Sequence, residues 1–193
     1  MERIIECVPN FSEGRNMEVI EDIVKAIEEG GLKPSCCNPG VKILNIDPGY
    51  ATNRTVITFT GSPEAVLEGI FQGVKRASEL IDMRQHQGTH PRSGATDVLP
   101  LIPISGITLE ECASLARGLA ERIYTELDIP CYCYEAAAFK PERKNLAVCR
   151  AGEYEALPEK ISDPDRRPDF GPDHFTGQAA RSGAINVGAR NFL

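Results

Sequence analysis

The sequence predicts an α+β fold of the α/β sandwich type: one domain in which helices pack on a mixed β-sheet. The main observation is that β-branched or apolar runs alternate with amphipathic stretches, in the order β-α-β-β-α-β-α-β. The length of 193 residues is enough for one substantial core. Contents of 41% hydrophobic and 25% charged residues are those of a globular domain, and there is no internal repeat.

The first two elements follow from an apolar run and a helical stripe. Residues 4–8 are largely apolar and end at Pro9, which predicts a strand. Residues 17–29 carry valine and isoleucine at helical spacing with acidic residues opposite, and a glycine pair ends that helix. The segment LKPSCCNPG at 32–40 is then a turn-rich connector.

Two strands and a second helix come next. Residues 41–46 are typical of a buried strand that ends at a DPG turn, and the β-branched residues 54–60 are expected to pair with it. Ser62 is an N-cap and Pro63 occupies the first helical position, so a helix is predicted from there toward Ile81.

A third strand and helix occupy the middle of the chain. Residues 97–104 form an apolar strand in which Pro100 and Pro103 cannot donate hydrogen bonds, so we expect an edge strand or a bulged one. The TLEE sequence that starts at Thr108 is a capping box and opens a helix that runs to about Leu127.

The last predicted strand covers residues 130–134, with Tyr132 and Tyr134 on one of its faces. Short helical pieces follow it. Residues 162–193 begin with a stretch dense in aspartate, arginine and proline, and we expect them to form an extended tail on the single domain.

Charge and hydropathy exclude several classes of protein. The net charge of −7 and a pI of about 5.1 argue against general binding of nucleic-acid phosphates. No run approaches the roughly 20 apolar residues of a membrane helix. The N-terminal MERIIECVPN lacks the apolar region of a secretory signal, so a cytoplasmic protein is expected.

The cysteines do not form a recognisable metal or disulfide framework. Their odd number, in a chain with no secretion signal, predicts reduced thiols. Cys36-Cys37 is an adjacent pair, and Cys131 and Cys133 point to the same face of a strand, so neither pair has zinc-site spacing. We therefore expect no metal. The seven cysteines lie at positions 7, 36, 37, 112, 131, 133 and 149.

The stretch IDMRQHQGTHPRSGATD holds two of the three histidines, His86 and His90, on a loop rich in turn-formers. Pro91 pushes His90 toward extended geometry. A loop histidine beside an arginine, here Arg92, is what proton transfer to an anionic substrate needs. Its spacing from His90 would allow His86 to be a metal ligand, but Gly88 argues against a helix there and no HExxH pattern is present.

Other polar clusters follow predicted strands, where sites are often carried on loops. They begin at Asn10, Asp47 and Asn53. Each alone has an ordinary structural interpretation: Asp47 can be a turn former, Asn10 a loop hydrogen-bonding residue, and Arg54 the partner of a surface carboxylate.

Together, several of these segments resemble the glutamate formiminotransferase family, and the resemblance covers essentially the whole chain. It includes the closing VGARNFL. The segments that carry it are ECVPNFSEGR at 6–15, DPGYATNRTVITFTGSPEAV at 47–66, IDMRQHQGTHPRSGATDVLPLIPI at 81–104, RAGEYEALPEK at 150–160 and PDFGP at 168–172.

The resemblance implies transfer of a formimino group from N-formiminoglutamate to N5 of tetrahydrofolate, a step of histidine degradation and one-carbon metabolism, with tetrahydrofolate as co-substrate and no metal. His90 corresponds to the family's catalytic histidine. Asp47 is expected to hydrogen-bond and orient it. Because both substrates are anionic, Arg54 and Arg92 are the candidate carboxylate ligands.

Further binding residues follow from the same resemblance. Asn10 and Asn53 are expected to contact substrate. The family's folate-binding segment follows PDFGP, although GPDHFTGQAARSG differs here from the family form. His174 in that segment is expected to have no acid–base role. The expected folate contacts are Gly171, Pro172, Phe175 and Gly183.

The resemblance extends to only the first of the family's two subdomains, a mixed sheet with helices on its outer face. Folate lies between the subdomains, so we expect the second to be supplied by a separate chain or by self-association. Two alternatives stay open: a non-catalytic folate-binding or regulatory module, and a scaffold whose open sheet face binds another protein.

Overall fold

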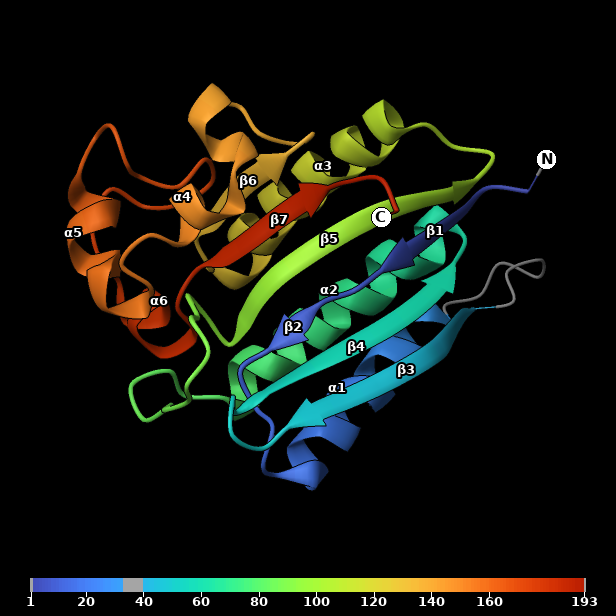
Figure 1. Ribbon diagram of the computed structural model, residues 1–193, viewed down its shortest axis with the longest axis horizontal. Coiled ribbons are helices and arrows are strands. Elements are labelled where there is room, and N and C mark those ends of the chain that lie inside the picture. The colour runs from blue at the N-terminus through green and yellow to red at the C-terminus, as the bar shows by residue number, and fades with distance from the viewer. Residues whose placement is uncertain (1, 33–39, 193) are drawn as a thin grey trace.

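The computed structural model describes residues 2–32 and 40–192, which contain one seven-stranded sheet (Figure 1). The spatial order is β3-β4-β1/β2-β5-β7-β6. The strands are β1 (Ile4–Cys7), β2 (Asn10–Phe11), β3 (Val41–Gly49), β4 (Arg54–Gly61), β5 (Thr96–Ser105), β6 (Cys131–Glu135) and β7 (Ile185–Ala189).

The sheet is mixed, as predicted: β7 runs parallel to β5 and β6, and the other pairings are antiparallel. Of the two alternatives expected for β5, the edge strand is wrong, because β5 lies in the middle of the sheet, whereas the register shifts in its pairings with β1 and β2 agree with an irregular, bulged strand. Its prolines are tolerated where the neighbouring strand is irregular. Pro100 lies opposite the break between β1 and β2, and the β1 register shifts beside Pro103.

Three long helices cover one face of the sheet, and Figure 1 shows them behind the strands. Each begins at a side-chain cap: Asn16, Ser62, and the capping box of Thr108 with Glu111. No helix in the described ranges has the length and apolar composition of a membrane span. The helices are α1 (Met17–Gly31), α2 (Pro63–Leu80) and α3 (Leu109–Leu127).

Among the described residues, the opposite face is covered over β6 and the adjacent parts of β7 and β5. Tyr132 and Tyr134 point into a second cluster there, as predicted, whereas Cys131 and Cys133 point into the main core under the long helices. Short helices on the left of Figure 1 form this cover. They are α4 (Leu146–Arg150), α5 (Leu157–Ser162) and α6 (Gly177–Ser182), with 3₁₀ turns η1 (Pro141–Lys144) and η2 (Tyr154–Ala156).

Residues 162–193 were expected to form an extended tail, and this expectation is wrong. The helix α6 and the strand β7 together cover most of residues 177–189. The strand β7 was missed because INVGA contains asparagine and glycine, yet all five residues are buried. Gly188 is needed there, since a β-carbon would collide with the ring of Tyr134. The predicted connector at 32–40, with Cys36-Cys37, falls almost entirely outside the described residues.

Candidate functional site

His90 lies on the loop between α2 and β5, next to Arg54 at the start of β4. Arg54 Nη1 is 2.6 Å from Nδ1 and 2.8 Å from Nε2 of the imidazole. Nδ1 is also 2.7 Å from the carbonyl oxygen of Pro91, which can only accept a hydrogen bond. With the ring proton on Nδ1, Pro91 accepts from the imidazole and the lone pair of Nε2 accepts from Arg54; with the proton on Nε2, Nδ1 accepts from Arg54 instead.

Arg54 is held in place from a second strand. Its Nε donates to the side-chain oxygen of Asn10 at 3.1 Å, and Asn10 in turn donates to the carbonyl of Val8 at 3.2 Å. The guanidinium is mostly buried, with 14% of its side chain exposed. Burial is the largest cause that lowers the Arg54 pKa, and the charge of Arg150 lowers it further.

A buried carboxylate lies behind this pair. Asp97, at the start of β5, has an Oδ2 atom 2.9 Å from Arg150 Nη2 and 3.7 Å from Arg54 Nη1. Its Oδ1 accepts from the backbone amide of Ser93 at 2.8 Å. The pKa of Asp97 is raised, because burial of the carboxylate outweighs the opposing effect of the two arginines.

Arg150 extends from the end of α4 and completes the cluster. Its Nη2 donates to the Pro91 carbonyl and lies 3.4 Å from Nδ1 of His90. Four side chains from four separate segments thus meet at one point: His90, Arg54, Asp97 and Arg150.

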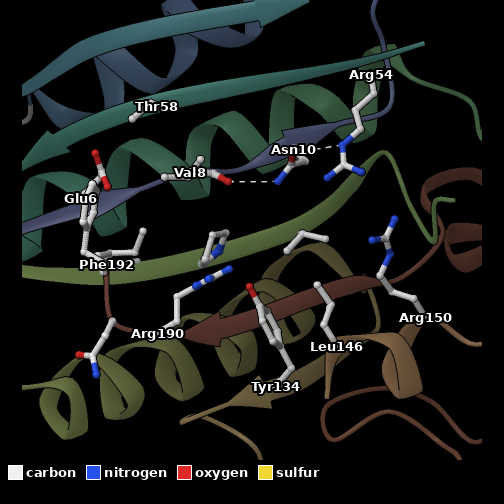
Figure 2. Close-up of a pocket in the computed structure, with 14 residues that line it drawn as sticks. Glu6, Val8, Asn10, Arg54, Thr58, Tyr134, Leu146, Arg150, Arg190 and Phe192 are labelled. Atoms are coloured by element: carbon white, nitrogen blue, oxygen red, sulfur yellow. Dashed lines mark hydrogen bonds between the residues drawn. The ribbon is translucent and has the colours of Figure 1, made fainter. Parts of the chain in front are cut away.

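Two hollows adjoin this cluster. The larger is a groove of about 490 Å³ on the open face of the sheet, and Figure 2 shows Arg54 and Arg150 at one end of it. The smaller, of about 260 Å³, is lined by His90 and Asp47. Arg54 and Asn10 belong to the walls of both hollows. An anionic ligand in either one would reach the Arg54 guanidinium.

The groove is apolar along its floor and carries further polar groups at its other end. There Figure 2 shows Arg190, Glu6 and the exposed ring of Phe192. Val98, Pro100 and Ile102 from β5, together with Tyr134 and Leu146, supply most of the apolar lining. Such a lining with a few charged groups suits an elongated ligand that has an aromatic part and anionic ends.

Asp47 lies near His90 without being bonded to it. Both line the smaller hollow, and Asp47 is opposite Val56 on the edge strand β3. Within the described ranges, the hydrogen-bond partners of His90 are Arg54, Arg150 and Pro91. The orienting role of Asp47 therefore stays a prediction, and Asp97 is the carboxylate that the structure places behind the histidine's arginine partners.

Arg92 has a different set of partners from those expected of a substrate ligand. Its guanidinium donates to Glu155 at 2.6 and 2.8 Å and to Glu153 at 3.1 Å. It lines neither hollow described above. Through these bonds Arg92 connects the histidine loop to η2. Its role in substrate binding stays a prediction.

Asn53 and His86 connect loops beside the site. Asn53 adopts a φ of 49°, accepts from the amide of Gly14 at 3.0 Å and donates to the Gln87 carbonyl at 2.9 Å. His86 Nε2 is 2.9 Å from the Asn53 carbonyl, and burial lowers the pKa of His86. Asn53 lines neither hollow, so its predicted substrate contact also stays a prediction.

The residues expected to bind folate lie outside both hollows. Phe175 packs on the cluster under β6, and Gly183 packs against the backbone of Ser93. Gly171 contacts the ring of Pro168, and Pro172 follows it. Their roles in folate binding stay predictions.

Sequence reasoning missed Arg150 and Asp97, although both lie within segments that carry the family resemblance. The available signal for Asp97 was an acidic residue that leads directly into the apolar run VLPLIPI. A charge at such a position is expected to be paired. Arg150 has no comparable signal, because its contact with Asp97 crosses 53 positions of the chain, from 97 to 150.

Among the described residues, no three His, Cys, Asp or Glu side chains are grouped closely enough to hold a metal ion. The five cysteines that the structure describes are free and buried.

The chain is similar to known proteins along its whole length. Residues 4–190 match the formiminotransferase domain, N-terminal subdomain. The formimidoyltransferase-cyclodeaminase of Rattus norvegicus is 48% identical over 193 residues, which are 100% of this chain and 34% of the rat protein. The glutamate formimidoyltransferase of Streptococcus pyogenes is 44% identical over 190 residues, 98% of this chain and 60% of that protein.

An archaeal relative gives the same result. The glutamate formimidoyltransferase of Thermoplasma acidophilum is 41% identical over 192 residues, which are 98% of this chain and 59% of that protein. The chain thus spans between about a third and about 60% of the length of these curated relatives.

Proposed function

Because the chain belongs to the formiminotransferase family, with residues 4–190 matching its N-terminal subdomain, we propose that it transfers a formimino group from N-formimino-L-glutamate to N5 of tetrahydrofolate. The observation that carries this proposal is the meeting of His90 with two guanidinium groups at the end of an open groove. Both proposed substrates, an amidine donor with carboxylates and an anionic folate, carry negative charges that guanidinium groups at the end of a groove can bind.

His90 is the proposed acid–base group. N5 of tetrahydrofolate attacks the formimino carbon, and a tetrahedral intermediate forms as the new N–C bond is made. The lone pair of Nε2 takes the proton that N5 loses. The protonated ring then gives a proton to the glutamate nitrogen as its bond to the carbon breaks. Acid–base transfer of this kind contributes about 10²–10⁴-fold to the rate.

We propose that the Pro91 carbonyl supports this role by favouring the tautomer with the proton on Nδ1. In that tautomer Nε2 carries the lone pair, 2.8 Å from Arg54 Nη1. The hydrogen bond from Nδ1 to Pro91 also stabilises the imidazolium that forms during the reaction. We propose that Asp47, across the smaller hollow, contributes its negative charge to that imidazolium.

The groove needs a second wall. We propose that folate lies along it, against the apolar residues of β5, and that a second subdomain or a partner chain covers the sheet face. The relatives extend well beyond the matched region, which supports this arrangement. An exposed apolar groove of this kind is the usual sign of a ligand or protein partner.

A transfer assay with tetrahydrofolate and N-formimino-L-glutamate tests the proposal, with His90→Ala and the exposed His174→Ala as matched variants. We expect His90→Ala to lose about 10²–10⁴-fold of the rate and His174→Ala to keep it. Folate binding without turnover in the wild-type protein would identify a non-catalytic folate module. The absence of both would favour the open face as a protein interface.

A further inference from the structure

The cluster beside His90 has one more positive than negative charge. Asp97 is the carboxylate that lies within 4.0 Å of the Arg54 and Arg150 guanidiniums in the part of the chain that the structure describes. Both arginine side chains are mostly buried, with 14% and 15% exposed. Burying a guanidinium that has no carboxylate of its own costs free energy. In the protein alone, one of the two arginine charges is therefore not neutralised.

Hydrogen bonding is also incomplete there. Arg150 Nε is buried without a hydrogen-bond partner among the described residues. Asp97 Oδ2 is close to both arginines but makes no well-aligned hydrogen bond to either. Arg54 Nη1 lies closer to the imidazole of His90, at 2.6 and 2.8 Å, than to Asp97 Oδ2, at 3.7 Å. Buried polar groups in native proteins rarely lack a hydrogen-bond partner.

We propose that Arg54, Arg150 and Asp97 form a subsite for one carboxylate group of the formimino donor, immediately beside His90. The identity of the donor rests on the proposed function, whereas the carboxylate chemistry rests on the cluster itself. The excess of one positive charge matches a carboxylate better than a doubly charged phosphate group. Arg150 and Asp97 thereby gain roles that the family resemblance had not suggested.

Asp97 acts through the arginines as a positioning residue. It is fully buried, so it cannot itself meet a ligand. Its Oδ1 is fixed by the Ser93 amide, and its Oδ2 holds Arg150 at 2.9 Å. The two guanidiniums can then point into the groove together in spite of their mutual repulsion.

The subsite also controls the histidine. In the tautomer with the proton on Nδ1, Arg54 donates to Nε2 and occupies the lone pair that should take the proton from N5. A carboxylate is a better acceptor for a guanidinium than a neutral imidazole. When the donor's carboxylate binds, Arg54 is expected to turn to it and leave Nε2 available. His90 thus becomes a base only when the donor is in place.

Binding of glutarate, a dicarboxylate that cannot transfer a formimino group, tests the subsite without any turnover. The dissociation constant is measured by ¹H–¹⁵N NMR titration at fixed ionic strength, with sodium chloride as the reference titrant. We expect Arg54→Met and Arg150→Met each to weaken binding by about tenfold or more, the usual effect of losing a charge-assisted hydrogen bond. Arg150→Lys should fall between wild type and Arg150→Met, because lysine keeps the charge without the bidentate geometry.

Asp97→Asn distinguishes two effects of Asp97 on glutarate binding: positioning of the arginines and repulsion by its negative charge. The Ser93 amide requires the asparagine oxygen, so the new amide group would face Arg150, donor against donor. Positioning therefore predicts weaker glutarate binding, whereas charge alone predicts stronger binding. Arg84→Met is the matched control, since Arg84 pairs with Asp82 and lines neither hollow. Thermal unfolding of each variant shows whether it folds, and the Arg150 variants provide the test if Asp97→Asn does not.

Wild-type affinity for glutarate in Arg150→Met, or tighter binding in Asp97→Asn, would overturn the subsite. So would a wild-type protein with no response to glutarate beyond that to chloride. These results are distinct from failure of the proposed function. A protein that binds glutarate through these residues but makes no product would keep the subsite and lose formimino transfer.

Discussion

The backbone of Gly183 lies directly against the carbonyl oxygen of Ser93 and leaves no room for a β-carbon. Gly183 has φ 69° and ψ −148°, a backbone conformation that residues other than glycine rarely adopt. The neighbouring Ala184 amide donates to the same carbonyl at 3.0 Å, and Gly94 forms a bridge with Gly183. This contact ties the beginning of β7 to the loop that carries His90.

Gly183→Ala should therefore destabilise the fold by roughly 2–3 kcal/mol, through backbone strain and the clash with Ser93. Gly118→Ala is the matched control, because a β-carbon at that exposed position of α3 meets nothing within 4 Å. It should stabilise the protein by about 0.4–1 kcal/mol. Urea unfolding measures both changes. Equal effects of the two substitutions would contradict the contact as described.

Arg54 and Arg92 should differ in what they affect. Arg54→Gln removes the guanidinium that lines both hollows and should raise the KM for the formimino donor by about tenfold or more. Arg92→Gln breaks the pairs with Glu153 and Glu155 and should cost about 1–2 kcal/mol of stability, with KM little changed. Steady-state kinetics and urea unfolding of both variants test this difference. A KM effect as large in Arg92→Gln would support its predicted role as a carboxylate ligand.

Local signals predicted the elements whose chemistry is local. The caps at Ser62 and Thr108 begin α2 and α3 where expected, because each satisfies free amides within its own first turn. The strand β7 had no such signal. Its five residues are buried by two parallel neighbours that come from elsewhere in the chain, and its short length and small side chains gave no periodicity.

The site shows the same division. His90 was identified from a loop whose glycines, proline and arginine are adjacent in sequence. Its partners in space, Asp97 and Arg150, come together only when β5 and α4 are placed on the sheet. Arg92 illustrates the opposite case, since its position next to the histidine in sequence suggested a shared role, whereas its side chain pairs with η2.

The buried cysteines should be inert in the native protein. Burial raises the pKa of Cys112 and Cys149 to about 11 and that of Cys133 to about 12, and it raises those of Cys7 and Cys131 as well. The reactive thiolate is therefore scarce at neutral pH. Brief iodoacetamide treatment followed by peptide mass spectrometry should leave these five unmodified, and treatment in urea should label all of them. Rapid native labelling of any one would contradict its burial.

Lys160 should make stability depend on alkaline pH. Its ammonium group is buried on Tyr132, donates to the Cys149 carbonyl at 2.6 Å, and has no carboxylate within 4.0 Å among the described residues. Burial lowers its pKa from 10.5 to about 8. Between these two values the unfolded chain binds a proton that the folded protein does not. Stability therefore rises with pH across this window, and the full cost of burying the charge is felt below pH 8.

Lys160→Met removes this titration. The free energy of unfolding of the wild type should increase relative to that of the variant by up to roughly 3 kcal/mol between pH 7.5 and 10.5. Urea unfolding at several pH values measures the free energy of unfolding of both proteins. Subtracting one from the other cancels the contributions of the other groups that titrate in this range. Lys25→Met, at an exposed position of α1, shows the effect of losing a lysine in general. A difference between wild type and Lys160→Met that stays constant with pH would mean that Lys160 remains charged in the folded protein.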